Sequence, residues 1–177
     1  MNILILIGSP RQEGNTQLLA EAFARGAEAH HSVTTLSVRD LNVGPCLGCN
    51  TCFASEGNTC CQSDDMVQVY AQLAQADMLV IASPVYFYGI SAQLKAVIDR
   101  LHNPVRNTFH IKKMALLLVG GASLPELFDS ITTQYELALR FFNIEDGGRI
   151  LVRGVRERGD IRQTAALQEA YELGGRQ

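Results

Sequence analysis

Short uninterrupted apolar runs alternate along this chain with longer segments in which apolar residues recur every three or four positions. The longer segments predict helices, with a last one near Ile161–Leu173. Because the two patterns alternate, we expect a parallel sheet covered by helices on both faces. The short runs, rich in Ile, Val and Leu, predict five buried strands: Asn2–Ile7, Val33–Val38, Met78–Ser83, Met114–Gly120 and Gly148–Val152.

Polar residues mark three helix starts. Ser63-Asp64-Asp65 precedes an amphipathic segment and places negative charge in its first turn, and Ser91 precedes apolar positions that share one helical face. Ser123-Leu124-Pro125-Glu126 has the pattern of a capping box with a proline near the helix start. Lys95 and Asp99 lie four positions apart on the helix after Ser91, which predicts a solvated ion pair.

The chain length predicts one domain. The 177 residues are enough to bury a sizeable core, and no internal repeat, low-complexity tract or linker divides them. The longest irregular stretch is Asn42–Gln62, and segments of this length inside a compact domain are usually functional. We therefore expect residues 1–177 to form a single domain with a cysteine-rich loop at 42–62.

The loop after the first predicted strand has the chemistry of a phosphate site. Ligands of open parallel sheets bind beyond the carboxyl ends of the strands, which selects the loops Gly8–Thr16, Pro84–Gly89 and Gly120–Ser123. The first loop opens a helix, whose N-terminus presents unpaired N–H groups and suits a phosphate. Ser9, Asn15 and Thr16 add short polar side chains, and Arg11 adds a permanent positive charge.

Two familiar phosphate loops are excluded. Gly8 and Gly14 are not followed by Gly-Lys-Ser/Thr, so this is not a nucleoside-triphosphate P-loop, and the chain contains no G-x-G-x-x-G dinucleotide motif. An ordinary polar loop between strand and helix is the alternative.

Aromatic residues gather in the second of these loops. Tyr86, Phe87 and Tyr88 follow Pro84-Val85 and precede Gly89, and a planar heterocycle would cover such rings. The alternative is that the rings pack against the edge of the sheet. In the third loop Gly120–Gly121 keeps side chains away from the same edge, although helix entry explains these glycines equally well.

The cysteines form a compact group. Cys46, Cys49 and Cys52 are followed by the adjacent pair Cys60 and Cys61. Zinc sites usually pair two C-x₂-C units across a longer spacer, whereas bacterial ferredoxins use C-x₂-C-x₂-C runs, so the spacing favours a [4Fe–4S] cluster with Cys60, or Cys61 in its place, as fourth ligand. Redox-active or idle thiols are the alternative. The four histidines lie outside this group and are expected at the surface or in the core.

Composition limits the partners. The net charge is −3, with 47% apolar and 19% charged residues, so we expect neither nucleic acid nor an anionic membrane surface as a partner. No apolar run approaches the ~20 residues of a membrane span, and no signal sequence is recognisable. We expect a cytoplasmic protein, in which reducing conditions disfavour disulfides. The one concentration of basic residues comprises Arg149, Arg153, Arg156 and Arg158.

Taken together, these motifs resemble the NADPH-dependent FMN reductase family, and most of all its iron–sulfur flavoprotein branch. They are G-S-P-R-x-x-G-N-T from Gly8, the cysteine segment ending in Asp64-Asp65-Met66, Ala76-Asp77, the loop Ser83–Phe87, and Leu94-Lys95 to Ile98-Asp99-Arg100. The resemblance is good over roughly the first two thirds of the chain and weak over the C-terminal third. It implies a flavodoxin-like, doubly wound, five-stranded parallel sheet of order 2-1-3-4-5, bound FMN, NAD(P)H as co-substrate, and a homodimer or homotetramer.

The resemblance also implies roles for individual residues. Ser9, Arg11, Asn15 and Thr16 would hold the FMN phosphate. The isoalloxazine would be lined by Pro84, Val85, Tyr86 and Phe87, with Gly89, Gly120 and Gly121 nearby. A cluster would be held by Cys46, Cys49, Cys52 and Cys60.

Three functions follow as hypotheses. The first is an FMN-dependent oxidoreductase that passes electrons from NAD(P)H or a ferredoxin-like donor to a quinone, a flavin or another acceptor. The second is an iron–sulfur flavoprotein that carries electrons between partner enzymes without a substrate of its own. The third is a non-catalytic binding module stabilised by zinc.

Overall fold

A computed structural model describes all residues, 1–177, and contains one five-stranded sheet. All four strand pairings are parallel, and the order is β2-β1-β3-β4-β5, which confirms the expected fold class. The fifth strand begins earlier than predicted, at Glu145 rather than Gly148, because its first residues already pair with Lys113 and Met114. The strands are β1 Asn2–Ile7, β2 Ser32–Ser37, β3 Met78–Pro84, β4 Lys113–Val119 and β5 Glu145–Val152.

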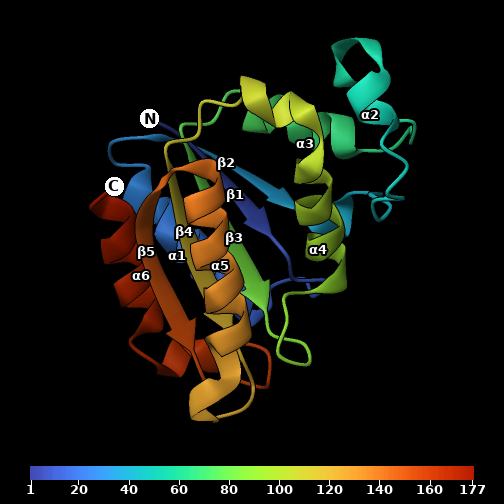
Figure 1. Cartoon of the computed structure of the whole chain (residues 1–177). Helices are drawn as coiled ribbons and strands as arrows, with labels where there is room; N and C mark the ends of the chain where they lie inside the picture. Colours follow the sequence, from blue (N-terminus) through green and yellow to red (C-terminus); the bar gives the residue numbers. More distant parts are fainter.

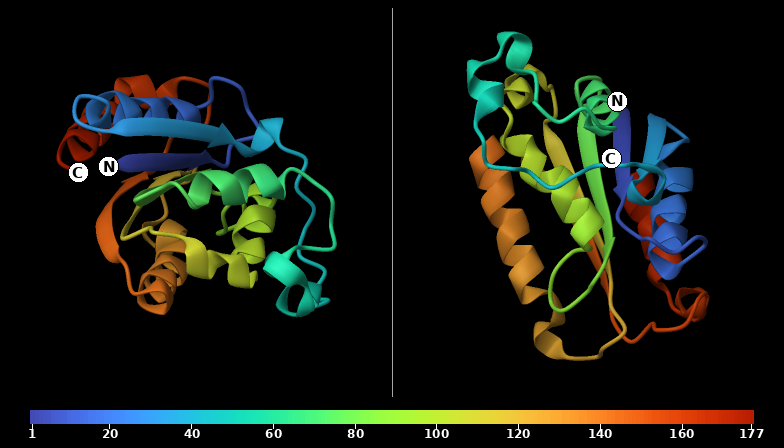
Figure 2. Two further views of the ribbon diagram at one scale, coloured as in Figure 1. Left: turned by 90° about the horizontal axis from the view of Figure 1, so that it is seen from above. Right: turned by 90° about the vertical axis from the view of Figure 1, so that its right-hand side faces the viewer.

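Helices cover both faces of the sheet (Figures 1 and 2). The pair α1 and α6 lies on one face, and α3, α4 and α5 lie on the other. None of the helices is long and apolar enough to cross a membrane. Their bounds are α1 Asn15–Ala27, α2 Thr51–Ala54, α3 Met66–Leu73, α4 Ala92–Asp99, α5 Asp129–Phe142 and α6 Ala166–Gly175.

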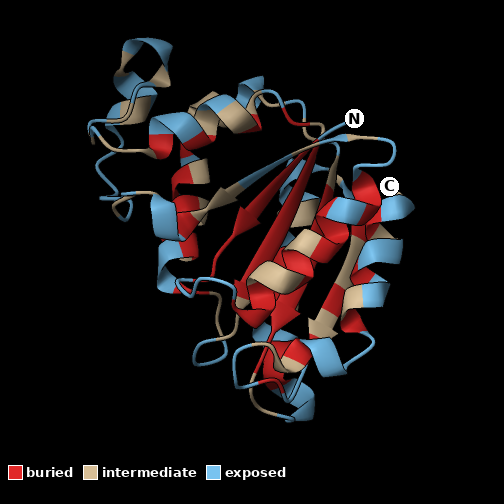
Figure 3. Ribbon diagram, turned by 180° about the vertical axis from the view of Figure 1, so that it is seen from behind, coloured by how far each residue is buried: buried red, intermediate tan, exposed pale blue.

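Alternation along β1 divides the core in two. Ile3, Ile5 and Ile7 pack under α1 and α6, and Leu4 and Leu6 pack under the three helices of the other face. The central strands are therefore buried on both sides (Figure 3), as the uninterrupted apolar runs predict.

Two of the predicted helix starts need correction. The last helix begins at Ala166, since Asp160–Gln163 form a 3₁₀ turn and the Thr164 hydroxyl accepts a hydrogen bond from the Ala166 N–H at 3.2 Å. The capping box at Ser123 is wrong, because a 3₁₀ turn at Pro125–Phe128 precedes α5 and no side chain caps it.

The other predicted starts are confirmed. The Ser91 hydroxyl accepts a hydrogen bond from the Leu94 N–H at 3.2 Å, and α3 begins at Met66, directly after the acidic pair. The negative charge therefore lies just before the first turn and not in it as expected, and Asp64 accepts a hydrogen bond from the Met66 N–H at 3.2 Å. Lys95 and Asp99 form the expected exposed ion pair.

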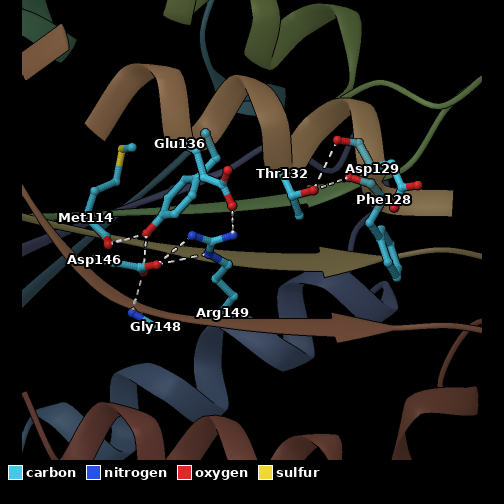
Figure 4. A network of polar contacts seen from close by, with 9 residues as sticks. Met114, Phe128, Asp129, Thr132, Glu136, Asp146, Gly148 and Arg149 are labelled. Carbon is cyan, nitrogen blue, oxygen red and sulfur yellow. Dashed lines mark hydrogen bonds and ion pairs between the residues drawn. The ribbon is translucent and has the colours of Figure 1, made fainter. Parts of the chain in front are cut away.

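A polar network joins α5 to β5 (Figure 4). Asp146 accepts hydrogen bonds from the Tyr135 hydroxyl at 2.8 Å, the Gly148 N–H at 2.9 Å and the Arg149 guanidinium at 2.7 Å. Arg149 also contacts Glu136 of α5 at 2.7 Å. Burial raises the pKa of Asp146, but these hydrogen bonds outweigh it and hold the pKa below its ordinary value. The network fixes the edge strand, which pairs with only one neighbour.

Glycines allow α1 and α6 to cross at close range. A Cβ on Gly26 of α1 would lie 1.9 Å from the Tyr171 carbonyl oxygen, and one on Gly174 of α6 would lie 2.1 Å from the Phe23 carbonyl oxygen. Both clashes are with backbone, which cannot swing aside as a flexible side chain can. These two positions therefore set the distance between the helices.

Gly174→Ala should force the two helices apart and lower the free energy of unfolding by at least about 2 kcal/mol. Gly175→Ala is the matched control, because its Cβ would meet only the Gly26 carbonyl oxygen at 3.6 Å, an ordinary contact. Urea unfolding of the three proteins measures the difference. Equal midpoints for the two variants would contradict the close crossing.

Candidate functional site

Each of the five parallel strands delivers its following loop to one edge of the sheet, the end at which the arrowheads of Figure 1 lie, and four of these loops form the candidate site. Three of them are the loops that the sequence selects, after β1, β3 and β4. The fourth follows β5 and spans residues 153–165. Sequence analysis missed this fourth loop, and the basic group around Arg153–Arg158 is the only signal that marks it.

The loop after β1 is held in shape by its own serine. The Ser9 hydroxyl is buried, accepts a hydrogen bond from the Arg11 N–H at 3.1 Å and donates one to the Arg11 carbonyl oxygen at 3.3 Å. The Arg11 side chain is exposed, and its guanidinium reaches the Arg156 carbonyl oxygen at 3.4 Å. Arg11 therefore carries a positive charge at this edge without a carboxylate partner.

The first turn of α1 offers backbone donors. Gly14 takes the N-cap position, so no side chain caps the helix, and the first N–H with a backbone acceptor is that of Leu18, which donates to the Gly14 carbonyl oxygen at 3.0 Å. The N–H groups of Asn15, Thr16 and Gln17 precede it and have no partner in the chain. Three such donors beside Arg11 fit the chemistry of a phosphate.

The Asn15 side chain links two loops of this edge. Its amide donates to the Glu157 carbonyl oxygen at 2.8 Å and accepts from the Gly159 N–H at 2.9 Å. The side chain thus ties the loop after β1 to the loop after β5, and Arg158 contacts Glu13 across the same gap. The side chain thus shapes the edge, while the Asn15 backbone N–H remains one of the free donors at the start of α1.

The aromatic loop is a tight, strained turn. Tyr86 and Gly89 exchange two backbone hydrogen bonds, at 2.9 and 3.0 Å, around Phe87 and Tyr88. These two central residues have φ of +47° and +63°, a conformation that costs about 1–2 kcal/mol for a residue with a side chain. Phe87 is 98% exposed, so the alternative in which the rings pack the sheet edge does not hold for it. The turn therefore presents exposed aromatic rings, which a planar ring could cover.

The glycine pair after β4 borders this surface. A Cβ on Gly120 would lie 2.4 Å from a Leu127 side-chain carbon, so packing alone explains that glycine. The Gly121 carbonyl oxygen accepts a hydrogen bond from Arg156 at 2.9 Å. A hydrogen bond from a side chain to a backbone carbonyl oxygen therefore joins the third loop to the fourth, as another joins the first loop to the fourth.

The cysteines lie at the opposite end of α4 from the aromatic turn (Figures 1 and 2). The helix has 8 residues, and at 1.5 Å per residue it separates the two regions by about 12 Å. Residues 46–61 contain the short helix α2 and a 3₁₀ turn, in which no residue is buried.

Four of the five cysteines share one small cavity of about 30 Å³. They are Cys46, Cys49, Cys52 and Cys60, and the cavity is also lined by Tyr70, Arg100, His102 and Asn103. His102, which sequence analysis placed outside the group, therefore borders it.

Cys61 lies outside this cavity. Its sulfur lies 3.5 Å from that of Cys49, but Cys60 lines the cavity with the other three cysteines and is therefore the better candidate for a fourth ligand. No three His, Cys, Asp or Glu side chains converge closely enough to hold a single metal ion.

The thiols differ in acidity. The Thr51 hydroxyl donates to the Cys49 sulfur at 3.3 Å and, with further hydrogen bonds, lowers the pKa of Cys49 to about 7. Burial raises the pKa of Cys52, and the neighbouring thiols add to this. Cys49 is therefore more readily ionised than Cys52.

A buried ion pair anchors the cysteine segment to the body of the protein. Arg100 is 3% exposed and contacts the carboxylate of Asp64, which also accepts a hydrogen bond from the Gly44 N–H at 3.0 Å. Burial raises the pKa of Asp64, but the hydrogen bonds from Arg100, Gly44 and Met66 outweigh it, so the pKa lies below its ordinary value. Asn103 adds a second anchor, because its amide donates to the Asn58 carbonyl oxygen at 2.9 Å.

Comparison with known proteins places this geometry in context. Residues 1–136 match the model of the family described as NADPH-dependent FMN reductase. An iron–sulfur flavoprotein of Methanocaldococcus jannaschii is 40% identical over 123 residues, 69% of this chain. The matches span only 46% to 64% of the lengths of the first iron–sulfur flavoproteins found.

Two further proteins match along nearly the whole chain. An FMN-dependent NADH:quinone oxidoreductase of Alcanivorax borkumensis is 25% identical over 98% of both chains. The solved structure of an NAD(P)H:quinone oxidoreductase from Methanothermobacter marburgensis superposes with a TM-score of 0.77 at 17% identity, covering 99% of this chain and 96% of the other. At that identity the structure confirms the fold.

Asp64→Asn should leave the buried Arg100 without its countercharge and lower the free energy of unfolding at neutral pH by about 3 kcal/mol. Because the folded pKa of Asp64 lies below its ordinary 3.8, the carboxylate contributes fully above about pH 4 and loses its contribution as the pH falls through the folded pKa. The gap between wild type and variant should therefore close in acid.

Urea unfolding at neutral and acidic pH measures this gap. Asp40→Asn is the control, since Asp40 pairs with Arg39 at the surface, where a pair contributes little. A gap that stayed constant with pH, or a control that lost as much stability, would show that the Asp64 pair is not the anchor.

Proposed function

The chain belongs to the NADPH-dependent FMN reductase family, and from this premise we propose that it is an FMN-dependent oxidoreductase. It would take electrons from NAD(P)H or a ferredoxin-like donor and pass them to a quinone, a flavin or another acceptor. The observation that carries the proposal is the meeting of two features at one sheet edge. An uncapped helix N-terminus lies beside Arg11, and a solvent-exposed aromatic turn follows the neighbouring strand β3.

Each feature of this edge suits one part of FMN. Arg11, the Thr16 hydroxyl and the N–H groups of residues 15–17 would bind the phosphate. Ser9 and Asn15 would hold the loop around it through the contacts described above.

The other loops would line the isoalloxazine ring. The segment Pro84–Phe87 with Gly89 would contact it, with Gly120 and Gly121 alongside. When bound, FMN supplies hydride acceptance and electron transfer, so the protein needs no general base. Its own contribution is orientation and electrostatics, with the aromatic turn excluding water from one side of the ring.

We also propose that Cys46, Cys49, Cys52 and Cys60 hold a [4Fe–4S] cluster. All four thiols line one cavity beside a buried positive charge, which suits a set of thiolate ligands. The cavity is small, but the segment that carries the cysteines has no buried residue to resist moving outward around a larger group.

Two other functions remain as alternatives. An electron carrier without its own substrate would bind FMN and the cluster but would not oxidise NAD(P)H. A zinc-stabilised binding module is less well supported, because no three ligands converge on a single point. We expect partners of the enzyme to be the nicotinamide nucleotide, a small acceptor and further copies of the chain.

Iron, acid-labile sulfide and FMN per chain, measured on protein purified without oxygen, decide among these functions. We expect one FMN, about four irons and about four sulfides. FMN-loaded protein should then oxidise NAD(P)H steadily when a quinone is supplied. A colourless protein with one zinc and no affinity for FMN would overturn both redox proposals, and FMN binding without NAD(P)H oxidation would favour the carrier.

Arg11→Ala should weaken FMN binding at least tenfold, since a hydrogen bond to a charged group contributes about 1.5–3 kcal/mol. Arg25→Ala is the control, because this substitution removes the same charge from the last turn of α1, far from the loop after β1. Quenching of flavin fluorescence on titration with apoprotein gives both affinities. Equal affinities would show that the phosphate does not bind at this loop.

A further inference from the structure

Arg100 has a donor that nothing in the chain accepts. The residue begins a 3₁₀ turn directly after α4, and its guanidinium is almost completely buried. One terminal nitrogen contacts Asp64 and lies 3.4 Å from the Gly44 carbonyl oxygen, but Nε has no hydrogen-bond partner. A buried donor left unpaired costs about 1–3 kcal/mol, so natural proteins rarely keep one without a reason.

The unpaired donor belongs to a residue that lines the cysteine cavity. Arg100 borders it together with Cys46, Cys49, Cys52 and Cys60. No acidic side chain lines the cavity, and four of the residues that line it are cysteines, so their sulfur atoms are candidate acceptors for the Arg100 donor. Asp64 and the Gly44 carbonyl oxygen both contact one terminal nitrogen of the guanidinium and hold that end of the group in place.

We propose that Arg100 is a positioning residue whose Nε–H donates a hydrogen bond to a sulfur of the iron–sulfur cluster and raises the reduction potential of that cluster. The inference rests on the cluster proposed above. Reduction adds one electron and no bond is broken, so the reduced form carries one more negative charge than the oxidised form. A hydrogen bond and a buried positive charge stabilise the more negative form, and hydrogen bonds to the sulfurs are among the factors that set cluster potentials.

A purely structural role for Arg100 is the competing explanation, because the residue also anchors the cysteine segment through Asp64. Arg100→Lys separates the two roles. It keeps a positive charge that can reach Asp64, but it removes the planar guanidinium and its Nε–H. Ser55→Ala is the matched control, since it removes the hydrogen bond from the Ser55 hydroxyl to the Thr59 carbonyl oxygen in the same segment without changing charge, and Ser55 does not line the cavity.

The test is a redox titration of the full chain, purified without oxygen and reduced stepwise with dithionite, with the reduced cluster followed by electron paramagnetic resonance. Iron and sulfide are measured first. We expect Arg100→Lys to lower the equilibrium constant for reduction about tenfold, equivalent to a midpoint potential about 59 mV lower, and Ser55→Ala to leave it unchanged. If Arg100→Lys kept the wild-type potential, or if both variants shifted it equally, the proposed role of Arg100 would be overturned. Neither result would contradict the presence of the cluster.

A second measurement needs no variant. In wild-type protein labelled with ¹⁵N-arginine, pulsed paramagnetic resonance of the reduced cluster should detect coupling to a guanidinium nitrogen, because Arg100 is the only arginine that lines the cavity. Absence of that coupling would overturn the role of Nε even if Arg100→Lys fails to retain its cluster. Wild-type protein without iron would overturn the cluster proposal and this inference with it.

Discussion

The parallel pairing of β1 with β3 is the constraint on which the rest of the proposed flavin edge depends. The chain leaves β1 on one side to form β2 and returns on the other side to form β3, so the loops after β1 and β3 diverge from the same point. The Gly8 N–H donates to the Ala82 carbonyl oxygen at 2.7 Å at that point. A Cβ on Gly8 would lie 2.7 Å from a Leu94 side-chain carbon, so α4 packs there as well.

The contacts of β3 with its neighbours also explain how the strained aromatic turn keeps its conformation. Two aromatic residues with positive φ would not hold this conformation in an isolated peptide. Here the turn is fastened at both ends, because the Val85 N–H donates to the Val119 carbonyl oxygen at 2.8 Å and the Ser91 N–H donates to the buried Ser83 hydroxyl at 3.1 Å. The hydrogen bonds to the sheet and to the cap of α4 therefore offset the conformational free energy that the turn costs. The turn leaves Phe87 exposed to solvent, where a planar ligand can cover it.

The cysteine segment is held in place by polar contacts and not by packing in the core. It contributes little to either half of the core and depends on a few polar anchors, chiefly Arg100 with Asp64 and Asn103 with Asn58. Such anchoring fixes the ends of the segment and leaves its middle free to adapt to what it binds. Because α4 carries the Ser91 cap at one end and leads into Arg100 at the other, one short helix positions both candidate centres.

The sequence by itself determined the elements, the parallel sheet and the motif loops, because periodicity and turn chemistry act between residues that are near neighbours in the chain. It also marked the group of cysteines. Only the tertiary structure decided which side chains are free to bind. Asn15 and Ser9 carry the motif of a phosphate site, yet they are engaged with the loop after β5 and with Arg11. The sequence does not distinguish Cys60 from the adjacent Cys61, and only the packing of the folded chain places Cys60 in the cavity. The partners of Asn15 lie more than 140 positions away, so no local pattern encodes them until the sheet brings the loops together.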